Sequence, residues 1–311
     1  MGTGLPLSVL GGGDAILATV IEGARRFMSR FRGRHNPRSR RLFMAALDAS
    51  LLQGLFAKWS YHLGFHGKFT VTTHEVRVTA GEKLPRPLVV AFASDLHAGP
   101  ATHPTVFTTL LDELTARRPD VVLLGGDYVS SSATQIDVLC EMLAQFSPPF
   151  GKYGVLGNHD LWTDDSHIVR RLTAAGVEVL VNRSCSLPPP FEGVSVCGVD
   201  DPWTGNADMT RTFQDAGPIR VFLSHSPDGL LLVKDEQFDV GFAGHTHGGQ
   251  VALRDGTPLM SASGPLSRQY GRGRFDIPGN GPLIVSRGFG NSTLPIRINA
   301  DPELIICTLY P

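Results

Sequence analysis

The sequence predicts a layered α/β domain with mixed sheets, preceded by an arm of different composition. Short apolar runs alternate with helical segments from about residue 69 to residue 181, which is typical of successive strand–helix–strand units. The second half has more short apolar runs and fewer helical periods, which favours mixed sheets. With 311 residues, of which 42% are hydrophobic, the chain can bury a sizeable core.

The expected elements follow one another closely. A strand rich in β-branched residues is expected first, at residues 70–78, as an edge or hairpin strand. Helices are expected at residues 104–117, 136–146 and 166–175. Further strands are expected at residues 88–93, 121–124, 153–156, 177–181, 194–199, 219–223, 238–242, 283–285 and 304–309. Because no repeat or low-complexity linker interrupts them, residues 69–311 are predicted to form one domain.

Residues 1–68 form an arginine-rich, apolar arm. No acidic residue lies between Glu22 and Asp48, whereas eight arginines do: Arg25, Arg26, Arg30, Arg32, Arg34, Arg38, Arg40 and Arg41. Removing these eight from the 28 basic residues leaves 20 basic against 29 acidic residues. A basic arm on an acidic body indicates a charged partner.

An apolar helix is expected at residues 42–57, directly after the arginines. Such a helix beside an arginine cluster is typical of an anchor on an anionic membrane surface, and a helix packed on the main domain is the alternative. The stretch Leu5–Ile21 is broken by glycines and Asp14, so it does not predict a transmembrane span. No nucleic-acid partner is expected, because the arginines lack interleaved aromatic residues.

The composition predicts a cytoplasmic protein at the periphery of the inner membrane. The four cysteines have no paired spacing, which fits a reducing compartment, and each is expected to be a small buried core residue: Cys140, Cys185, Cys197 and Cys307. Export is the alternative, because Ser39–Phe43 resembles a twin-arginine signal. Against export, this segment begins far from the N-terminus and Asp48 interrupts the apolar run after it.

Polar clusters follow five of the expected strands, each at the point where the strand ends. They contain seven side chains with metal-ligating atoms: Asp95, His97, Asp127, Asn158, His225, His245 and His247. In open α/β sheets, ligands bind outside the carboxyl ends of the strands, so the five clusters can converge on one point. Imidazoles, carboxylates and an amide oxygen together suit divalent first-row metals better than calcium. Seven ligands exceed the needs of one tetrahedral ion but fit a pair of ions, which is the arrangement used for phosphoryl transfer.

These motifs resemble the signature of the calcineurin-like metallophosphoesterases. The resemblance rests on Asp95-x-His97, Gly126-Asp127, Gly157-Asn158-His159-Asp160, His225 and Gly244-His245-Thr246-His247, and extends from about Leu88 to the C-terminus. It implies a four-layer α-β-β-α sandwich in a catalytic domain covering residues 69–311.

The same resemblance implies a role for each site residue. Asp95, His97 and His247 would hold the first metal, Asp127 would bridge both metals, and Asn158, His225 and His245 would complete the second. His159 would act on the scissile phosphate as a transition-state stabiliser or leaving-group acid, held in place by Asp160. The cofactors would be two divalent ions, with manganese preferred and iron, zinc or cobalt as alternatives.

Further segments are similar to one bacterial branch of this family. They include Gly198–Asp201, Ser224–Asp228, Gly248–Gln250, Ser286–Gly290 and Leu294–Arg297. The branch contains membrane-associated phosphodiesterases, including a UDP-2,3-diacylglucosamine pyrophosphatase of lipid A synthesis. The resemblance implies hydrolysis of a phosphodiester or pyrophosphate bond in a lipid-linked or nucleotide-sugar substrate. The alternatives are a soluble phosphodiesterase or phosphatase acting on nucleotides or phosphoproteins, and a non-catalytic metal-bound scaffold.

Other polar residues have weaker signals. Arg268, Arg272 and Arg287 are predicted to contact the substrate phosphate, with a solvated loop or a structural ion pair as the alternative. Asp200 and Asp201 are expected to cap a turn near Trp203. Five histidines outside the motifs are predicted to be non-catalytic: His62, His66, His74, His103 and His167.

Overall fold

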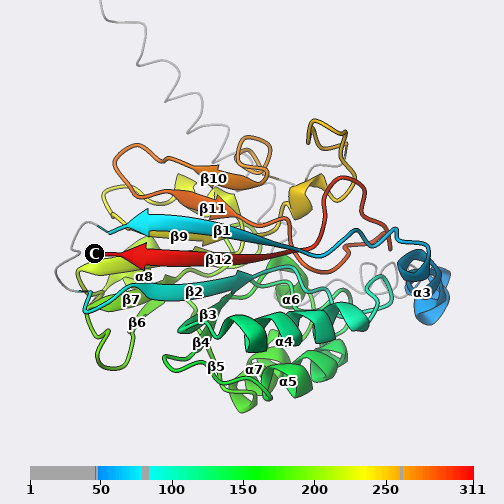
Figure 1. Ribbon diagram of the computed structural model, residues 1–311, viewed down its shortest axis with the longest axis horizontal. Coiled ribbons are helices and arrows are strands. Elements are labelled where there is room, and N and C mark those ends of the chain that lie inside the picture. Colours follow the sequence, from blue (N-terminus) through cyan, green and yellow to red (C-terminus); the bar gives the residue numbers. More distant parts are fainter. Residues whose placement is uncertain (1–45, 47, 79–83, 260–261, 263) are drawn as a thin grey trace, which may run out of the picture.

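Two six-stranded sheets pack against each other in the computed structural model, which describes residues 46, 48–78, 84–259, 262 and 264–311 (Figure 1). The first sheet has the order β1-β12-β2-β3-β4-β5 and the second β10-β11-β9-β8-β7-β6. Each sheet contains parallel and antiparallel pairs, so the prediction of mixed sheets is confirmed.

The strands are short and agree with most of the expected runs. The first sheet consists of β1 (Thr70–Arg77), β12 (Glu303–Tyr310), β2 (Leu88–Ala93), β3 (Val121–Leu124), β4 (Lys152–Gly154) and β5 (Val177–Val179). The second consists of β10 (Gly273–Phe275), β11 (Leu283–Val285), β9 (Val240–Ala243), β8 (Ile219–Ser224), β7 (Val194–Gly198) and β6 (Arg183–Ser186). The strands that the sequence did not predict, β6 and β10, are edge strands with partly exposed side chains, so they lack an apolar run.

Alternation along the central strands divides the core between two layers. In β2, Val90 and Phe92 point into the apolar layer between the two sheets, whereas Ala91 and Ala93 face the helices. Strand β3 alternates in the same way, as the two-residue period of a strand requires. Both faces of these strands are therefore buried, which explains their uninterrupted apolar sequences.

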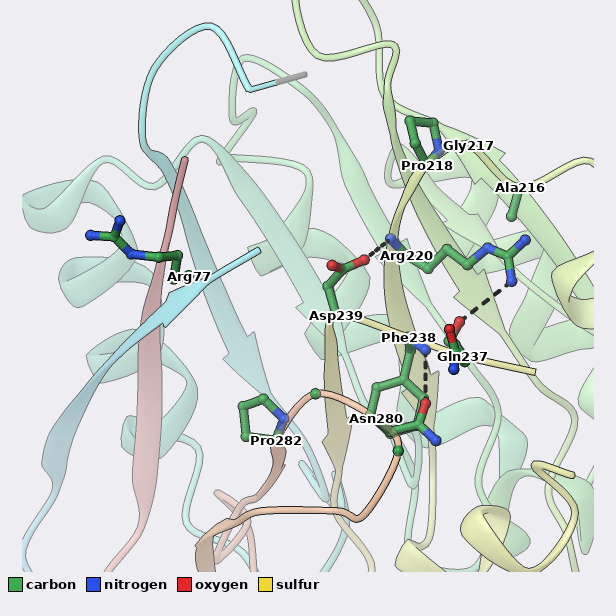
Figure 2. A pocket seen from close by; sticks show the side chains of 12 residues that line it. Arg77, Ala216, Gly217, Pro218, Arg220, Gln237, Phe238, Asp239, Asn280 and Pro282 are labelled. Carbon is green, nitrogen blue, oxygen red and sulfur yellow. Dashed lines mark hydrogen bonds between the residues drawn. The ribbon is translucent and has the colours of Figure 1, made fainter. Parts of the chain in front are cut away.

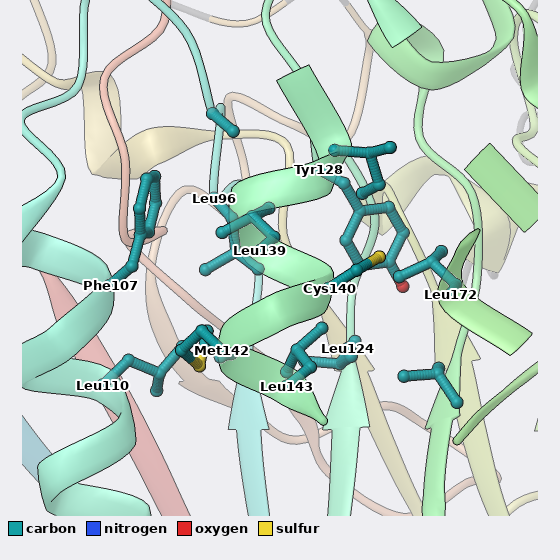
Figure 3. Close-up of a cluster of buried hydrophobic side chains, with 14 of the residues drawn as sticks. Leu96, Phe107, Leu110, Leu124, Tyr128, Leu139, Cys140, Met142, Leu143 and Leu172 are labelled. Atoms are coloured by element: carbon teal, nitrogen blue, oxygen red, sulfur yellow. The ribbon is translucent and has the colours of Figure 1, made fainter. Parts of the chain in front are cut away.

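Three helices cover the outer face of the first sheet: α4 (Thr105–Arg117), α5 (Ile136–Leu143) and α7 (Asp165–Ala174). Figure 3 shows α5 above β3, with Leu139 and Leu143 directed into a cluster that includes Leu124 and Tyr128. The outer face of the second sheet is covered by α8 (Met209–Phe213), whose Phe213 stacks on Phe222 of β8. The four-layer α-β-β-α arrangement is confirmed.

Three of the cysteines are buried as expected, at positions 140, 197 and 307, whereas Cys185 on β6 is half-buried. All four are free thiols. Asp200 and Asp201 cap the turn that contains Trp203, as predicted: Asp201 Oδ1 accepts from the Trp203 amide at 3.1 Å, and Asp200 Oδ2 from the Asn206 amide at 2.8 Å.

The helix expected at residues 42–57 is broken rather than continuous. Residues 48–50 are helical, a 3-10 turn covers Leu52–Gly54, and α3 runs from Leu55 to His62. Gln53 (φ 53°) and Gly54 (φ 95°) adopt left-handed conformations, which an α-helix cannot contain. The arginine cluster and the twin-arginine-like segment lie outside the described residues, as does Leu5–Ile21. Among the described helices, none has the length and apolarity needed to cross a bilayer.

Candidate metal centre

Seven potential ligands meet where strands of both sheets end. Asp95 and His97 follow β2, Asp127 follows β3, and Asn158 opens the short helix α6 (Asn158–Leu161) after β4. His225 follows β8 of the second sheet, and His245 and His247 follow β9. Because the strands that carry these residues are parallel within each sheet, their carboxyl ends share one edge.

Unusual backbone conformations turn these residues toward one another. Five of the seven have positive φ: Asp95 (55°), His97 (42°), Asp127 (53°), His245 (70°) and His247 (53°). A left-handed conformation costs a non-glycine residue on the order of 1 kcal/mol, and such residues cluster at functional sites. Backbone hydrogen bonds hold the strained turns: the Asp95 amide donates to Gly126 O and the His97 amide to Asp127 O, both at 2.9 Å.

Glycines allow the loops to approach this closely. Gly126 itself has φ 86°, and a Cβ atom on it would lie 2.5 Å from the Gly157 nitrogen. At Gly157, a Cβ would lie 2.2 Å from Asp127 Oδ1. Side chains at either position would therefore separate Asp127 from the Asn158 turn.

The ligand atoms lie at distances expected around shared cations. Nε2 of His97 is 3.0 Å from Nε2 of His247, which is 3.5 Å from Asp95 Oδ1. Asp127 Oδ2 lies 3.5 Å from His97 Nε2 and 3.4 Å from His225 Nε2. With metal–ligand bonds of about 2.1 Å, neighbouring ligand atoms are separated by about 3.0–3.4 Å.

Asn158 and His245 complete the second group. His225 Nε2 lies 3.1 Å from Asn158 Oδ1 and 3.2 Å from His245 Nδ1. Its other ring nitrogen, Nδ1, lies 2.8 Å from Gly125 O. Donation to that carbonyl directs Nε2 toward the cluster, which is how metal-ligating histidines are usually oriented.

The electrostatics of the cluster fit a cation. Burial lowers the pKa of His97 to about 3, and burial together with His97 lowers the pKa of His247 well below its ordinary value. Both imidazoles are therefore neutral and offer nitrogen lone pairs. Asp95 and Asp127 are buried beside them. Because neutral nitrogens and carboxylates converge on the same space, positive charge between them is stabilised.

Asp160 does not hold His159, and this part of the prediction is wrong. Its buried carboxylate accepts hydrogen bonds from the amides of Asp127 (2.8 Å), Tyr128 (2.9 Å) and Gly157 (2.9 Å). Asp160 therefore fixes the backbone that carries Asp127. Because α6 turns directly after Asn158, the third helical residue points back to the start of its own helix, as in a capping interaction.

His159 is oriented by other groups. Its Nδ1 donates to Ser130 O at 2.7 Å, and its amide donates to Asp127 Oδ1 at 2.8 Å. The indole ring of Trp162 packs on the imidazole at 4.6 Å between ring centroids. Donation by Nδ1 directs Nε2 away from Ser130, so Nε2 is the nitrogen available for a substrate oxygen.

A cavity of about 210 Å³ opens over this cluster. It is lined by Asn158, His159, Trp162, His245, Thr246, His247, Gly249, Gln250, Ala262, Ser292 and Thr293. Three of the seven candidate ligands, Asn158, His245 and His247, thus line the same cavity as His159, which suits a substrate phosphate.

Comparison with known families agrees with this geometry. The family described as calcineurin-like phosphoesterase matches residues 88–249, about half of the chain. The chain belongs to this family. It is therefore a phosphoric ester hydrolase of a family that uses divalent metal ions, and the matched residues contain all seven clustered ligands and His159.

Several bacterial metallophosphoesterases resemble the chain over most of its length. An uncharacterized metallophosphoesterase of Aquifex aeolicus is 28% identical over 78% of this chain and 90% of its own length. The Escherichia coli phosphodiesterase YaeI is 28% identical over 87% of this chain and 99% of its own length. Among solved structures, a 5′-nucleotidase precursor from Thermus thermophilus aligns with a TM-score of 0.40 and 15% identity, covering 71% of this chain and 55% of its own.

The predicted substrate arginines are not among the residues that line the 210 Å³ cavity over the ligand cluster, called the metal cavity below. Arg287 Nη2 donates to Glu303 Oε1 at 3.0 Å and to Thr70 Oγ1 at 2.7 Å, so it forms a structural ion pair. Arg272 Nη1 donates to Asn299 O at 2.7 Å, and Arg268 is exposed to solvent. For Arg287 the structural alternative is correct, because its charge is already matched.

The side chains of Trp162 and Arg297 contact histidines of the site, and neither was predicted to belong to it. Trp162 follows His159 by three positions, and the helical turn of α6 brings the two rings together. Arg297 is buried, with Nη2 3.2 Å from His247 Nδ1 and Nη1 2.8 Å from Ala300 O. The spacing in helix α6 could have revealed Trp162, but nothing local indicates that Arg297 meets a histidine 50 positions away.

A second cavity lies at the opposite end of the second sheet. Figure 2 shows it where β8 and β9 begin, with Asp239 accepting from the Arg220 amide at 2.8 Å and Asn280 from the Phe238 amide at 2.8 Å. Its volume is about 710 Å³. It contains none of the clustered ligands, so the chemistry belongs to the smaller cavity.

Proposed function

We propose that this chain hydrolyses a phosphodiester or pyrophosphate bond in a lipid-linked or nucleotide-sugar substrate, and that UDP-2,3-diacylglucosamine is the compound to test first. One observation carries the lipid part: the loop that lines the metal cavity at Ser292 and Thr293 continues into Leu294, which is 39% exposed. An apolar border beside a phosphate-sized cavity suits a phosphate ester that carries acyl chains. The phosphodiesterase named among the relatives supports the type of bond.

The side chains of the site have defined tasks in this proposal. A bound pair of divalent ions lowers the pKa of a coordinated water and neutralises charge on phosphate oxygens. Asp127 lies between the two histidine groups and is the residue that both ions would share. His159, oriented by Ser130 and Trp162, presents Nε2 to the departing oxygen and acts as its acid or stabiliser.

Manganese is the proposed metal, with iron, zinc and cobalt as competitors. Four imidazoles, two carboxylates and one amide oxygen form a mixed nitrogen and oxygen ligand set, which is compatible with each of these ions. Reconstitution of metal-free protein with each ion separately, followed by turnover measurements and metal analysis, identifies the ion that supports catalysis.

The proposed place of action is the cytoplasmic periphery of the inner membrane. The arginine-rich composition of residues 22–48 supports this, since cationic segments bind anionic lipid headgroups. An enzyme that acts on a lipid-linked substrate would meet it there.

The decisive experiment measures release of UMP from UDP-2,3-diacylglucosamine by the manganese-loaded full chain, with bis-p-nitrophenyl phosphate as a soluble reference substrate. UMP release that disappears in His159→Asn and persists in His167→Asn supports the proposal. Turnover of the reference substrate without UMP release would reject the lipid substrate and leave a soluble phosphodiesterase. A metal-loaded protein without turnover of either substrate would instead indicate a scaffold.

A further inference from the structure

Helix α3 packs on the domain by one face, and its other face is apolar and exposed. Ala57 and Ser60 are buried against the domain. The other face carries Leu55, Phe56, Trp59 and Leu63, with Trp59 57% and Leu63 71% exposed. Consecutive helical residues are about 100° apart, so these four positions fall within an arc of about 100°.

Large apolar side chains are more concentrated on this exposed face than elsewhere on the described surface. The described residues include ten large exposed hydrophobic side chains, and five of them lie between residues 55 and 65: Leu55, Phe56, Trp59, Leu63 and Phe65. Single exposed apolar residues are normal on soluble proteins. Five such side chains within eleven residues, three of them aromatic, indicate a binding surface.

Several contacts fix the direction of this face. Ser60 Oγ donates to Pro295 O, and the Arg297 amide donates to Phe65 O at 2.6 Å. The ring of Tyr61 stacks on His103 at 4.2 Å between centroids. The helix is therefore anchored by its inner face, and the outer face is held in one orientation.

The charges around the face favour an anionic partner. No acidic residue lies between Asp48 and Glu75, whereas Lys58 and Lys68 are both exposed there. Asp48 itself accepts hydrogen bonds from Ser131 and Gln135. The eight arginines of residues 25–41 precede this segment in the sequence. A second copy of the same face would bring like charges together, whereas anionic headgroups would neutralise them.

Helix α3 also lies at the end of the molecule that carries the metal cavity. Figure 1 shows α3 at the end of the molecule toward which β2 runs, the end where the metal ligands follow their strands. Pro295 and Arg297, which attach to the α3 segment, belong to the same loop as Ser292 and Thr293 of the cavity wall.

We propose that the outer face of α3, formed by Leu55, Phe56, Trp59 and Leu63 with the adjoining Phe65, inserts into the interface of an anionic lipid bilayer. Aromatic and leucine side chains enter the headgroup boundary while Lys58 and Lys68 meet lipid phosphates. The inference deepens the proposed function, on which it rests for the origin of the substrate, because docking would place the cavity wall next to the membrane surface.

Vesicle flotation with the full-length chain tests this docking. Wild-type protein is expected to float with vesicles of phosphatidylcholine and phosphatidylglycerol, and to bind pure phosphatidylcholine vesicles more weakly. The double variant Trp59→Ser/Leu63→Ser is expected to bind about tenfold more weakly or worse, because it removes two interfacial apolar side chains. The matched control Val138→Ser/Leu253→Ser replaces two side chains that are each 47% exposed elsewhere and is expected to bind like wild type.

Tryptophan fluorescence gives a second measurement that does not depend on how the double variant folds. Anionic vesicles are expected to shift the emission of wild type to shorter wavelength. Trp59→Phe is expected to lose this shift and to keep floating. Equal flotation of wild type and the double variant would overturn the proposal. So would a wild-type dimer that the double variant converts to a monomer, with no vesicle binding by either protein.

The readouts separate the failure of docking from failure of the proposed function. The double variant is expected to keep wild-type turnover of bis-p-nitrophenyl phosphate, because it leaves the metal cavity unchanged. Flotation without UMP release would reject the proposed substrate and retain the docking surface. UMP release together with unchanged flotation of the double variant would reject the docking surface and retain the substrate.

Discussion

The Nε2 atoms of His97 and His247 lie 3.0 Å apart, inside a buried cluster. Two neutral imidazole nitrogens gain little from facing each other unless a proton or cation lies between them. Asp95 and Asp127 border the same space, at 3.5 Å from His247 and His97 respectively. A bound divalent cation would stabilise this arrangement, which makes the effect of ligand substitution predictable.

Asp127→Asn should abolish metal-dependent turnover. The amide removes the negative charge that His97 and His225 share at 3.5 and 3.4 Å. Since loss of a group that only orients a metal ligand costs metal proteins about 10–100-fold in affinity or activity, loss of the ligand itself should cost at least about 100-fold. Turnover and metal content by elemental analysis check this result. The exposed Asp112→Asn on α4 is the matched control, and equal metal content in both variants would contradict the assignment.

Metal removal should destabilise the protein through the same residues. A chelator leaves buried carboxylates and imidazoles without their shared cation, and ligand binding to the folded state alone raises stability by mass action. We expect a lower midpoint of urea unfolding after chelation, restored by added manganese. In Asp127→Asn the midpoint should change little on chelation. A wild-type unfolding midpoint that is the same with and without chelator would exclude a contribution of metal to stability.

Asp160→Asn and His159→Asn should separate stability from catalysis. The carboxylate of Asp160 accepts from three buried amides at 2.8–2.9 Å, and an asparagine would turn an NH₂ group toward some of them. An unsatisfied buried donor costs about 1–3 kcal/mol, so urea unfolding should show a loss of that size. His159→Asn should leave the unfolding midpoint near wild type and reduce turnover by about 10²–10⁴-fold. Equal unfolding free energies of the two variants would contradict the role of Asp160 in fixing the backbone that carries Asp127.

The sequence predicted most of the sheet framework and the meeting of the seven candidate ligands for the same reason. Strands such as β2 and β3 are buried on both faces, so they are uninterrupted apolar runs, and the polar residues after them are conspicuous. Edge strands β6 and β10 have no such run. The break at Gln53 and Gly54 was not predicted, because an apolar composition does not specify where a helix changes direction.

Pairings between distant residues could not be read from the sequence. The position of Arg287 after a strand predicted a phosphate ligand, but its partner Glu303 lies 16 positions later on β12. Arg297 meets His247 only because the loop after β11 returns to the ligand cluster. Charge type and local spacing identify candidates, whereas the fold decides which charges are already matched.

Arg287→Gln should therefore affect stability rather than substrate binding. The change breaks the ion pair of Arg287 with Glu303, which is mostly buried, and the hydrogen bond to Thr70. We expect a loss on the order of 1 kcal/mol in urea unfolding and an unchanged KM for bis-p-nitrophenyl phosphate. Arg268→Gln, on the exposed loop, should leave stability unchanged. A several-fold rise in KM for Arg287→Gln would restore its role as a substrate ligand.

The attachment of α3 should weaken in mild acid through His66. This buried imidazole contacts Ser60 Oγ at 3.2 Å through Nδ1 and accepts from the His103 amide at 3.2 Å through Nε2. Burial, with nearby His103 and Arg297, lowers the pKa of His66 from 6.5 to about 4. Between these two values the unfolded chain binds more protons than the folded chain, so stability is complete above about pH 6.5 and falls toward pH 4.

A difference between wild type and His66→Gln isolates this contribution. Glutamine does not titrate, so the other histidines near α3, His62 and His103, contribute to both proteins. We expect the wild type to lose up to a few kcal/mol more than His66→Gln between pH 7 and pH 4.5, measured by urea unfolding. Amide hydrogen exchange within α3 should rise over the same range in wild type alone. Parallel pH profiles for the two proteins would show that His66 does not control the attachment of α3.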